Sequence, residues 1–464
     1  MSAVTENPPP LADPSWAGHI RATLKLGLPL IAAQLAQQAI TITDTVMLGW
    51  LGAEPLAASV LGTTLFFLAF IFASGFAHAI IPIAAAAEGA GDVAGVRRSI
   101  RMGLWLMTGV ATALMPMLWF SGSLFRLIGQ DPALADMAQG YLRIAQWALY
   151  PALYITVLRA YFAALERANI VMWAMFVGVA INAALNWALI FGNWGAPALG
   201  IRGAAWATLG THLTVLVPLI LYAALVPALR RYQIFTRFWR PDWPGLAEIT
   251  RLGLPVSATL LAEVGLFSAS AFMMGWLGTI ALAAHGIAMQ IISAIFMIPY
   301  GLSAAATVRV GRAVGRRDPL GLVRAAITVL GMAIGIAIAA ALVLWLAPGP
   351  LIWLFLSRDD PEAAAIVAAG TGLLAVAAVF QLVDTLQVIS VSLLRGLKDT
   401  RRPMLIAILS YWALGLPAAY LLGFTAGFGG PGVWGGLAVG LSAAAILLTW
   451  RFLHRERLGL VRLG

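Results

Sequence analysis

Long uncharged stretches recur along the whole chain and constrain its fold more than any other feature. The first runs from Leu26 to Ala53 and contains one ionisable residue, Asp44. Crossing the hydrocarbon layer of a membrane takes about 20 apolar residues. Because 61% of the 464 residues are hydrophobic and only 10% are charged, one soluble core cannot bury them. The chain is therefore predicted to be a polytopic membrane protein.

Twelve apolar stretches are long enough to span a membrane as helices. They lie at about 26–49, 55–80, 102–122, 137–158, 170–192, 204–227, 252–276, 279–304, 325–347, 364–393, 404–423 and 433–450. An even number of spans places both termini on the same side of the membrane.

The distribution of basic residues supports this count. Of the 29 Lys and Arg residues, all but four fall in the tails and alternate loops on the N-terminal side. The exceptions are Arg126, Arg202 and Arg358 on the other side, and Arg143 inside a span. Since cytoplasmic loops are rich in Lys and Arg, both termini are predicted to be cytoplasmic.

The two halves of the chain resemble one another. "MLGWLG" from Met47 matches "MMGWLG" from Met273, and Gly75 and Asp92 fall on Gly301 and Asp318, all at an offset of 226 residues. Later segments match at an offset of 232. Such tandem repeats are typical of secondary transporters, in which the binding site lies between two bundles.

The predicted fold is therefore all-α, with twelve transmembrane helices in two six-helix bundles. The predicted parts are a cytoplasmic tail (1–25), an N-terminal lobe (26–229), a cytoplasmic linker (230–251), a C-terminal lobe (252–450) and a second cytoplasmic tail (451–464).

Three acidic residues, Asp44, Glu263 and Asp384, lie inside predicted spans. A carboxylate at membrane depth costs about 2.5–3.5 kcal/mol on insertion scales, and such residues usually serve ion or proton movement. With no Lys or Arg partner expected inside the membrane, interhelical hydrogen bonding is the weaker explanation. These acids are predicted to exchange a cation or a proton.

In the first half, Asp44 is predicted to lie in a polar cluster. Asn182 and Asn186 are four residues apart and share one helix face, and Thr208, five residues after Gly203 on the next span, lies at a similar depth. The oxygens of such a cluster could coordinate Na⁺ or hold a proton.

A polar stripe leads along the first span to this cluster. Gln34, Gln37, Thr41 and Asp44 recur at steps of three, four and three, so they share one face. We expect this stripe to line a substrate cavity. In the repeat Gln37 corresponds to Glu263, whereas Asp44 aligns with Ser270, so the halves share a scaffold but not their acids.

In the second half, Glu263 and Asp384 are predicted to lie at matching depth. They stand twelve and eleven residues from Arg251 and Arg395, taken as the cytoplasmic boundary, which gives roughly 16–18 Å. A shared site for Na⁺ or H⁺ is therefore expected. Phe296, whose helix is expected to break at Pro299, and Gln381 are assigned to the substrate cavity.

Other chemistries are not supported by the sequence. Cysteine is absent, and "GRAVGRRDP" at Gly311 lacks the Gly-Lys-Ser/Thr ending of a phosphate-binding loop. No nucleophile or metal-ligand pattern is recognisable, so neither an enzyme nor a resident metal or other cofactor is expected. The net charge of +10 follows from short arginine-rich loops and does not indicate nucleic-acid binding.

Four segments together resemble the multidrug and toxic compound extrusion (MATE) family, in particular its bacterial NorM-like branch. They are "TDTVMLGWLG", "LAEVGLFSASAFMMGWLGTIALAAHGIAMQ", "FQLVDTLQVISVSLLRGLKDTRRPM" and "INAALNWALIFGNWGAPALGIRGAAWAT". The resemblance implies a twelve-helix antiporter that exports hydrophobic, often cationic drugs in exchange for Na⁺ or H⁺.

The resemblance also assigns residues. Glu263 and Asp384 match the acids of a cation site in the second lobe, near an aromatic placed at Phe296. Asp44, Asn182 and Asn186 match a first-lobe site. Some archaeal and DinF-like relatives have an acid where Asn186 stands, so the amide departs from their pattern.

Three alternatives remain open. A flippase for lipid-linked saccharides would share the fold but often has more spans and a basic cavity. A membrane enzyme would need a catalytic cluster, and a channel would conduct without a counter-ion. The abundance of Ala and Arg fits a bacterial inner membrane, and the protein is expected to act as a monomer on small organic molecules.

Overall fold

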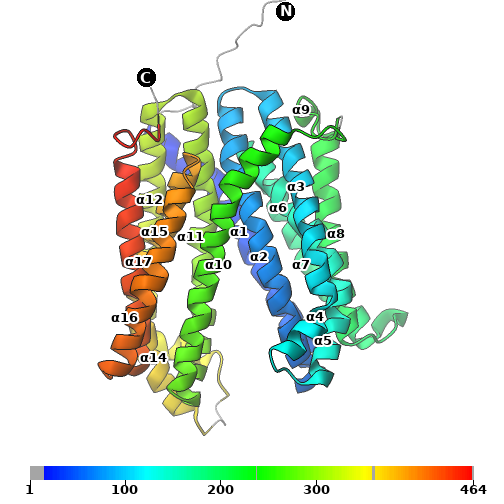
Figure 1. Cartoon of the computed structure of the whole chain (residues 1–464), viewed down its shortest axis with the longest axis vertical. Coiled ribbons are helices and arrows are strands. Elements are labelled where there is room, and N and C mark those ends of the chain that lie inside the picture. The colour runs from blue at the N-terminus through cyan, green and yellow to red at the C-terminus, as the bar shows by residue number, and fades with distance from the viewer. Residues whose placement is uncertain (1–14, 237, 358–360, 462–464) are drawn as a thin grey trace, which may run out of the picture. The chain divides into compact units, whose positions relative to one another are not determined.

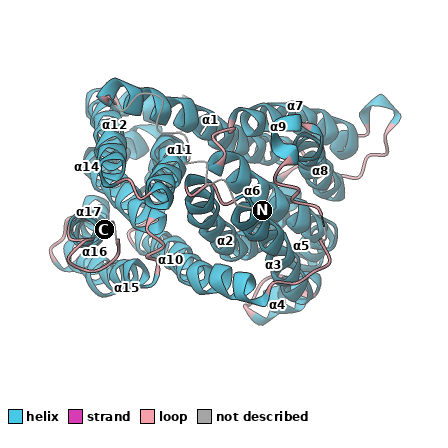
Figure 2. Ribbon diagram, turned by 90° about the horizontal axis from the view of Figure 1, so that it is seen from above, coloured by secondary structure: helices cyan, strands magenta, loops and turns pink. Residues whose placement is uncertain are grey.

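The described part of the chain is helical. The computed structural model describes residues 15–236, 238–357 and 361–461, and within these it contains no strand (Figure 2). The outer ends of the two predicted tails, residues 1–14 and 462–464, lie outside the described residues, as does Arg358. The main helices (Figure 1) are α1 (Trp16–Gly49), α2 (Ala53–Gly89), α3 (Val93–Trp119), α4 (Ser121–Leu127), α5 (Pro132–Ala145), α6 (Leu149–Ala164), α7 (Asn169–Phe191), α8 (Ile201–Leu225), α9 (Pro227–Arg230), α10 (Trp243–Trp276), α11 (Thr279–Arg316), α12 (Pro319–Leu346), α13 (Pro348–Trp353), α14 (Ala363–Gly396), α15 (Arg401–Ile408), α16 (Leu416–Tyr420) and α17 (Gly429–Leu453).

Short segments of other helix types complete the order. Two are 3₁₀ turns, η1 (Gln146–Ala148) and η2 (Asn193–Gly195), and two are π-helical, η3 (Leu409–Gly415) and η4 (Leu421–Thr425). The π-helical segments flank α16, in which Pro417 lacks the N–H that an α-helix would donate.

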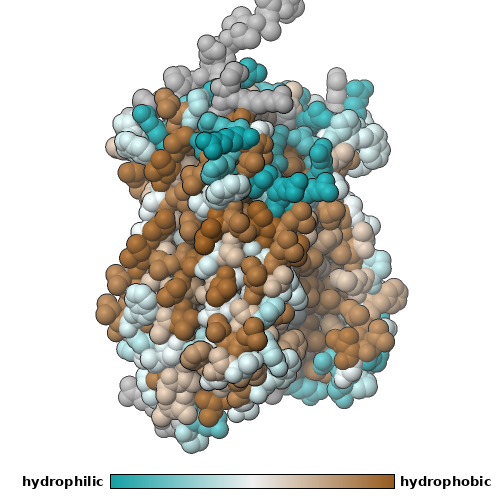
Figure 3. All heavy atoms as spheres, turned by 60° about the vertical axis from the view of Figure 1, so that its left-hand side comes forward, coloured by the Kyte–Doolittle hydropathy of each residue, from teal (hydrophilic) through white to brown (hydrophobic). Residues whose placement is uncertain are grey.

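Eleven of the described helical stretches are long and apolar enough to cross a membrane, counting Arg401–Thr425 as one. Each overlaps one predicted span. The remaining prediction, 137–158, falls on α5, η1 and α6, which are shorter. Pro151, in the first turn of α6, cannot donate to the carbonyl of Trp147, and this explains the break. Apolar side chains cover most of the face in Figure 3, with hydrophilic ones concentrated toward its upper end.

The chain forms two compact units whose boundaries fall inside helices. Unit 1 is Ala32–Ser257, and unit 2 contains the described residues up to Ile31 together with those from Ala258 onward. This differs from the predicted lobe boundaries at 26 and 252. The first half of α1 packs in unit 2, and the first half of α10 packs in unit 1.

Glycines explain these packings. A Cβ atom at Gly301 of α11 would lie 2.6 Å from Cα of Ile31, and one at Gly75 of α2 would lie 2.5 Å from Cα of Ser257. Only glycine permits such close approach of two backbones. Gly75 and Gly301 are the residues that the repeat aligns, as are Ile31 and Ser257, at the same offset of 226.

Helix caps repeat as well. Asp92 accepts a hydrogen bond from the N–H of Gly95 at 2.8 Å, and Asp318 accepts one from Gly321 at 2.7 Å. Each carboxylate caps the N-terminus of its helix, α3 or α12. The aligned acids therefore have the same structural role in both halves.

The predicted linker, 230–251, is anchored on unit 1, and α10 begins within it at Trp243. Tyr232 donates to Glu88 at 2.7 Å and accepts from Arg231 at 2.5 Å. Burial and the neighbouring Glu88 raise the pKa of Tyr232 to about 12, so its hydroxyl stays protonated as a donor. Asp242 forms an ion pair with Arg98.

Candidate functional site

In unit 1 the carboxylate of Asp44 is held by two amides. Asn182 and Asn186, one turn apart on α7, donate to the same oxygen of Asp44 at 2.9 and 2.6 Å. Both asparagines are fully buried. The Asn186 amide also donates to the Asn182 carbonyl at 3.3 Å, while the Asn186 carbonyl oxygen has no hydrogen-bond partner among the described residues. The predicted trio is thus brought together and retains an unused acceptor.

Thr208 joins this cluster through a residue that the sequence analysis missed. Tyr141 of α5 is buried and lies in electrostatic range of Asp44 and close to Thr208. Gly62 makes room for its ring, because a Cβ there would lie 2.8 Å from Tyr141. A tyrosine in a span gives no local polar pattern, so only the packing of α5 reveals it. We call Asp44, Asn182, Asn186, Thr208 and Tyr141 the first-unit cluster.

The polar stripe of α1 combines a residue bonded to another helix with exposed residues. Gln34, predicted to line the substrate cavity, is half-buried and accepts a hydrogen bond from Arg159 of α6 at 2.5 Å. Arg159, expected in a cytoplasmic loop, lies within α6 and is half-buried. Gln37 and Thr41 are exposed, and the Thr41 hydroxyl donates to the backbone carbonyl of Gln37 at 3.4 Å.

In unit 2, α10 and α14 bring Glu263 and Asp384 within electrostatic range of each other. Asp384 is 3% exposed, and its Oδ1 atom has no hydrogen-bond partner among the described residues. A buried carboxylate oxygen without a donor is costly. This oxygen is therefore available to a proton or a cation.

A buried arginine accompanies these acids. Arg395, in the last turn of α14, is 9% exposed and lies in electrostatic range of Glu263 and Tyr411. Arg395 is predicted to lie at the cytoplasmic boundary, and the structure places it in the last turn of α14 with its side chain buried. We call Glu263, Asp384, Arg395 and Tyr411 the second-unit cluster.

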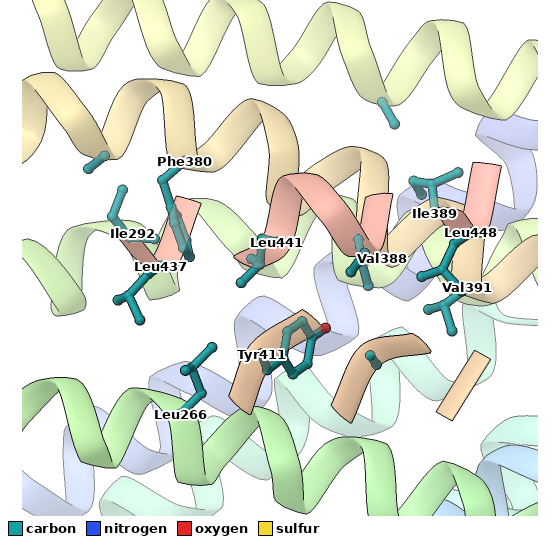
Figure 4. Close-up of a cluster of buried hydrophobic side chains, with 14 of the residues drawn as sticks. Leu266, Ile292, Phe380, Val388, Ile389, Val391, Tyr411, Leu437, Leu441 and Leu448 are labelled. Atoms are coloured by element: carbon teal, nitrogen blue, oxygen red, sulfur yellow. The ribbon is translucent and has the colours of Figure 1, made fainter. Parts of the chain in front are cut away.

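The π-helical segment η3 places Tyr411 in this cluster. Tyr411 is fully buried among apolar side chains that include Leu266, Val388 and Leu441 (Figure 4). Its hydroxyl has no hydrogen-bond partner among the described residues. The adjacent Trp412 donates to the carbonyl of Ala262 at 3.2 Å, which fixes η3 beside the residue that precedes Glu263. Short π-helical segments often mark functional sites.

The remaining predicted cavity residues differ in setting. Gln381 is fully buried one turn before Asp384, and its amide reaches Thr385 at 3.5 Å while its carbonyl is unpartnered within the described chain. Phe296 is half-buried and stacks on Tyr300, with ring centroids 5.8 Å apart. The expected break at Pro299 does not occur, because α11 continues to Arg316; membrane helices tolerate proline where neighbours satisfy the freed carbonyl.

These arrangements suit small cations. Among the described residues, no group of three or more His, Cys, Asp or Glu side chains could hold a metal ion. Carboxylate and amide oxygens are hard ligands, and a carboxylate also accepts a proton. Each unit therefore provides an acidic, partly unsatisfied polar cluster on its membrane helices.

Comparison with known proteins gives a consistent result. A family model described as MatE matches residues 29–188 and 255–421. A relative from Rhizobium meliloti (strain 1021), described as probable multidrug resistance protein NorM, is 49% identical over 448 residues, which cover 96% of each chain. The multidrug resistance protein NorM of Burkholderia vietnamiensis is 38% identical over 442 residues and 95% of each chain.

Solved structures share the fold at lower identity. A crystal structure of MATE in the straight conformation matches with a TM-score of 0.86 and 23% identity over 95% of this chain and 97% of that one. The eukaryotic MATE transporter AtDTX14 matches with a TM-score of 0.84 and 20% identity over 97% and 100%. The predicted fold is confirmed. The chain belongs to the MatE family, as a NorM-like member of a family of membrane transporters rather than enzymes.

Proposed function

We propose that the protein is a secondary antiporter that exports hydrophobic or cationic organic compounds from the cell in exchange for Na⁺ or H⁺. Its NorM relatives are described as multidrug resistance proteins. The observation that carries the proposal is the buried Oδ1 atom of Asp384, a carboxylate oxygen inside a membrane helix without a donor among the described residues. Such an oxygen requires a cation or a proton.

On this proposal both clusters exchange the coupling ion. Glu263 and Asp384 take up Na⁺ or H⁺ in unit 2, and Asp44 does so in unit 1 with Asn182 and Asn186 as supporting ligands. Thr208 completes the first-unit cluster. The residues assigned to the organic substrate are Gln34, Gln37 and Thr41 in unit 1, and Phe296 and Gln381 in unit 2. No other cofactor takes part, and the protein works as a monomer in the bacterial inner membrane with both termini in the cytoplasm.

Efflux from proteoliposomes tests this proposal. Ethidium movement is measured with a pH gradient alone and with a Na⁺ gradient alone. The wild type should transport under one of them. Asp44→Asn, Glu263→Gln and Asp384→Asn should lose at least tenfold in rate, while Glu54→Gln, which neutralises an exposed acid in the first turn of α2, should not.

Two outcomes would contradict the proposal. The first is full ion-driven efflux by the three folded acid variants. The second is an ion conductance that needs no counter-ion, which would indicate a channel.

A further inference from the structure

The linker segment 230–245 is held against α3 where that helix enters its predicted membrane span. Trp105 donates through its indole nitrogen to the backbone carbonyl of Phe238 at 2.8 Å, and the backbone N–H of Asp242 donates to the sulfur of Met102 at 3.1 Å. Met102 is the first residue of the predicted span, and Trp105 lies about 4–5 Å farther along the helix. The linker backbone from Phe238 to Asp242 is therefore level with the boundary of the hydrocarbon layer.

Two tryptophans of this segment are exposed at that level. Trp239 and Trp243 are 72% and 71% exposed, and among the 17 tryptophans of the chain only Trp194 is more exposed. An indole combines a large apolar ring with one N–H donor, and such rings concentrate among the headgroups of a membrane. The position of the linker on α3 allows lipid headgroups to cover both rings.

The same segment is strongly basic. Residues 230–245 contain four arginines and one acid, Asp242, and this acid already forms an ion pair with Arg98. Arg240, next to Trp239 in the sequence, is exposed and has no hydrogen bond or ion pair among the described residues. A guanidinium binds phosphate oxygens through charge-assisted hydrogen bonds. Its position beside exposed indoles therefore suits a ligand that has both a phosphate and an apolar part.

The internal repeat indicates that the shared scaffold does not require these side chains. At the offset of 226, residues 230–245 align with residues 4–19, which contain no Lys or Arg. Neither Trp239 nor Trp243 has an aromatic counterpart there. Both segments lead into a long membrane helix, so the arginines and the exposed indoles are not needed to begin such a helix. Binding outside the shared fold explains them better.

We propose that the linker binds anionic phospholipids of the cytoplasmic leaflet, with Arg240 at the lipid phosphate and Trp239 and Trp243 among the headgroups. Basic residues next to membrane spans attract anionic lipids. A zwitterionic lipid carries the same phosphate but adds a positive charge that Arg240 repels, so the linker prefers a net negative headgroup such as that of phosphatidylglycerol. This inference does not depend on the coupling ion or on the exported compound.

A fluorophore on a single cysteine tests the proposal. Ala247→Cys is labelled with bimane in the otherwise cysteine-free chain, because Ala247 is exposed one turn after Trp243 on α10. The protein is placed in phosphatidylcholine vesicles that contain phosphatidylglycerol or phosphatidylcholine with a nitroxide near the headgroup. Half-maximal quenching should need about fivefold less of the labelled phosphatidylglycerol, which is the factor expected for one arginine at a membrane surface.

Variants and salt separate the contributions. Arg240→Gln should bring the two labelled lipids to within about twofold of each other, whereas Arg457→Gln, which removes an exposed arginine from the tail of unit 2, should leave the preference unchanged. NaCl at about 0.5 M should remove most of the preference by screening. Trp239→Ala combined with Trp243→Ala should weaken quenching by both lipids, because the rings cover the headgroup region of either one.

The outcomes that would overturn the inference are specific. They are equal quenching by the two lipids in wild type, quenching by neither, a preference that persists in folded Arg240→Gln, or unchanged quenching in the double tryptophan variant. Loss of the preference on adding inorganic phosphate at constant ionic strength would identify a site for a soluble anion and would also overturn it. If Arg240→Gln does not fold, a wild-type preference that survives high salt has the same consequence.

Discussion

At the scale of single residues, the two units stabilise their membrane carboxylates differently. Asp44 accepts two amide hydrogen bonds, whereas Glu263 has a guanidinium in electrostatic range. Hydrogen bonds to a charged acceptor are about twice as strong as neutral ones. The amides of unit 1 are therefore as much a part of its site as the carboxylate.

This reasoning predicts a strong effect of Asn186→Ala. The substitution removes a donor 2.6 Å from Asp44 together with the unused carbonyl oxygen of the same amide. Since a hydrogen bond to a charged group contributes about 1.5–3 kcal/mol, ion-driven ethidium efflux should fall by roughly ten- to hundredfold. Initial rates in proteoliposomes measure this.

Asn193→Ala is the matched control. Its amide donates to the carbonyl of Trp187 at 3.2 Å and takes no part in the first-unit cluster, so efflux should stay within about twofold of wild type. An Asn186→Ala rate equally close to wild type would show that the amide is not needed to hold the ion site.

At the scale of helices, close backbone contacts decide which half of α1 and α10 belongs to which unit. Ile31 packs on Gly301 and Ser257 on Gly75, as in the repeat. Ser257 also donates through its hydroxyl to the carbonyl of Phe72 at 2.6 Å. These contacts hold the first halves of two long helices while their second halves pack elsewhere.

Gly301→Ala should therefore destabilise the protein, although alanine favours helices by about 0.5–1 kcal/mol over glycine. The new methyl group would overlap the backbone of α1 at Ile31, and overpacking costs about 1–3 kcal/mol. Thermal unfolding in detergent should show a lower Tm.

Gly335→Ala in α12 provides the comparison, because no heavy atom lies within 4 Å of its added Cβ. That variant should keep or raise the Tm. Equal melting of the two alanine variants would mean that α1 can move away from α11 without loss, and the packing argument would then be incorrect.

At the scale of the whole molecule, the distribution of basic residues predicts the orientation in the membrane. The sequence assigns all but four of the 29 Lys and Arg residues to the side of the two tails, which predicts a cytoplasmic linker and an external loop between α7 and α8. The absence of cysteine provides a clean background for labelling.

Single cysteines test this orientation. A membrane-impermeant maleimide should label Ala198→Cys, in the exposed loop before α8, in intact cells. Arg240→Cys, in the exposed linker, should be labelled only after permeabilisation. The cysteine-free parent should remain unlabelled in both conditions, and the reverse pattern would invert the topology.

The sequence by itself determined the membrane helices, the tandem repeat and the acids, because each depends on local composition and on the cost of charge in an apolar layer. It also predicted the Asp44, Asn182 and Asn186 trio, since helix periodicity and depth suffice to align short side chains. The sequence also aligned Gly75 with Gly301, but it did not show the close backbone contacts that these glycines permit.

Only the tertiary structure decided which partners these residues have. Tyr141 and Tyr411 reach the clusters from helices distant in sequence, and Arg159 reaches Gln34 in the same way. Arg395, at the predicted boundary of a span, is buried in the last turn of α14. The reason is physical. An arginine at the end of a span can extend toward water or fold back toward a carboxylate, and the neighbouring helices, not the local sequence, select between the two.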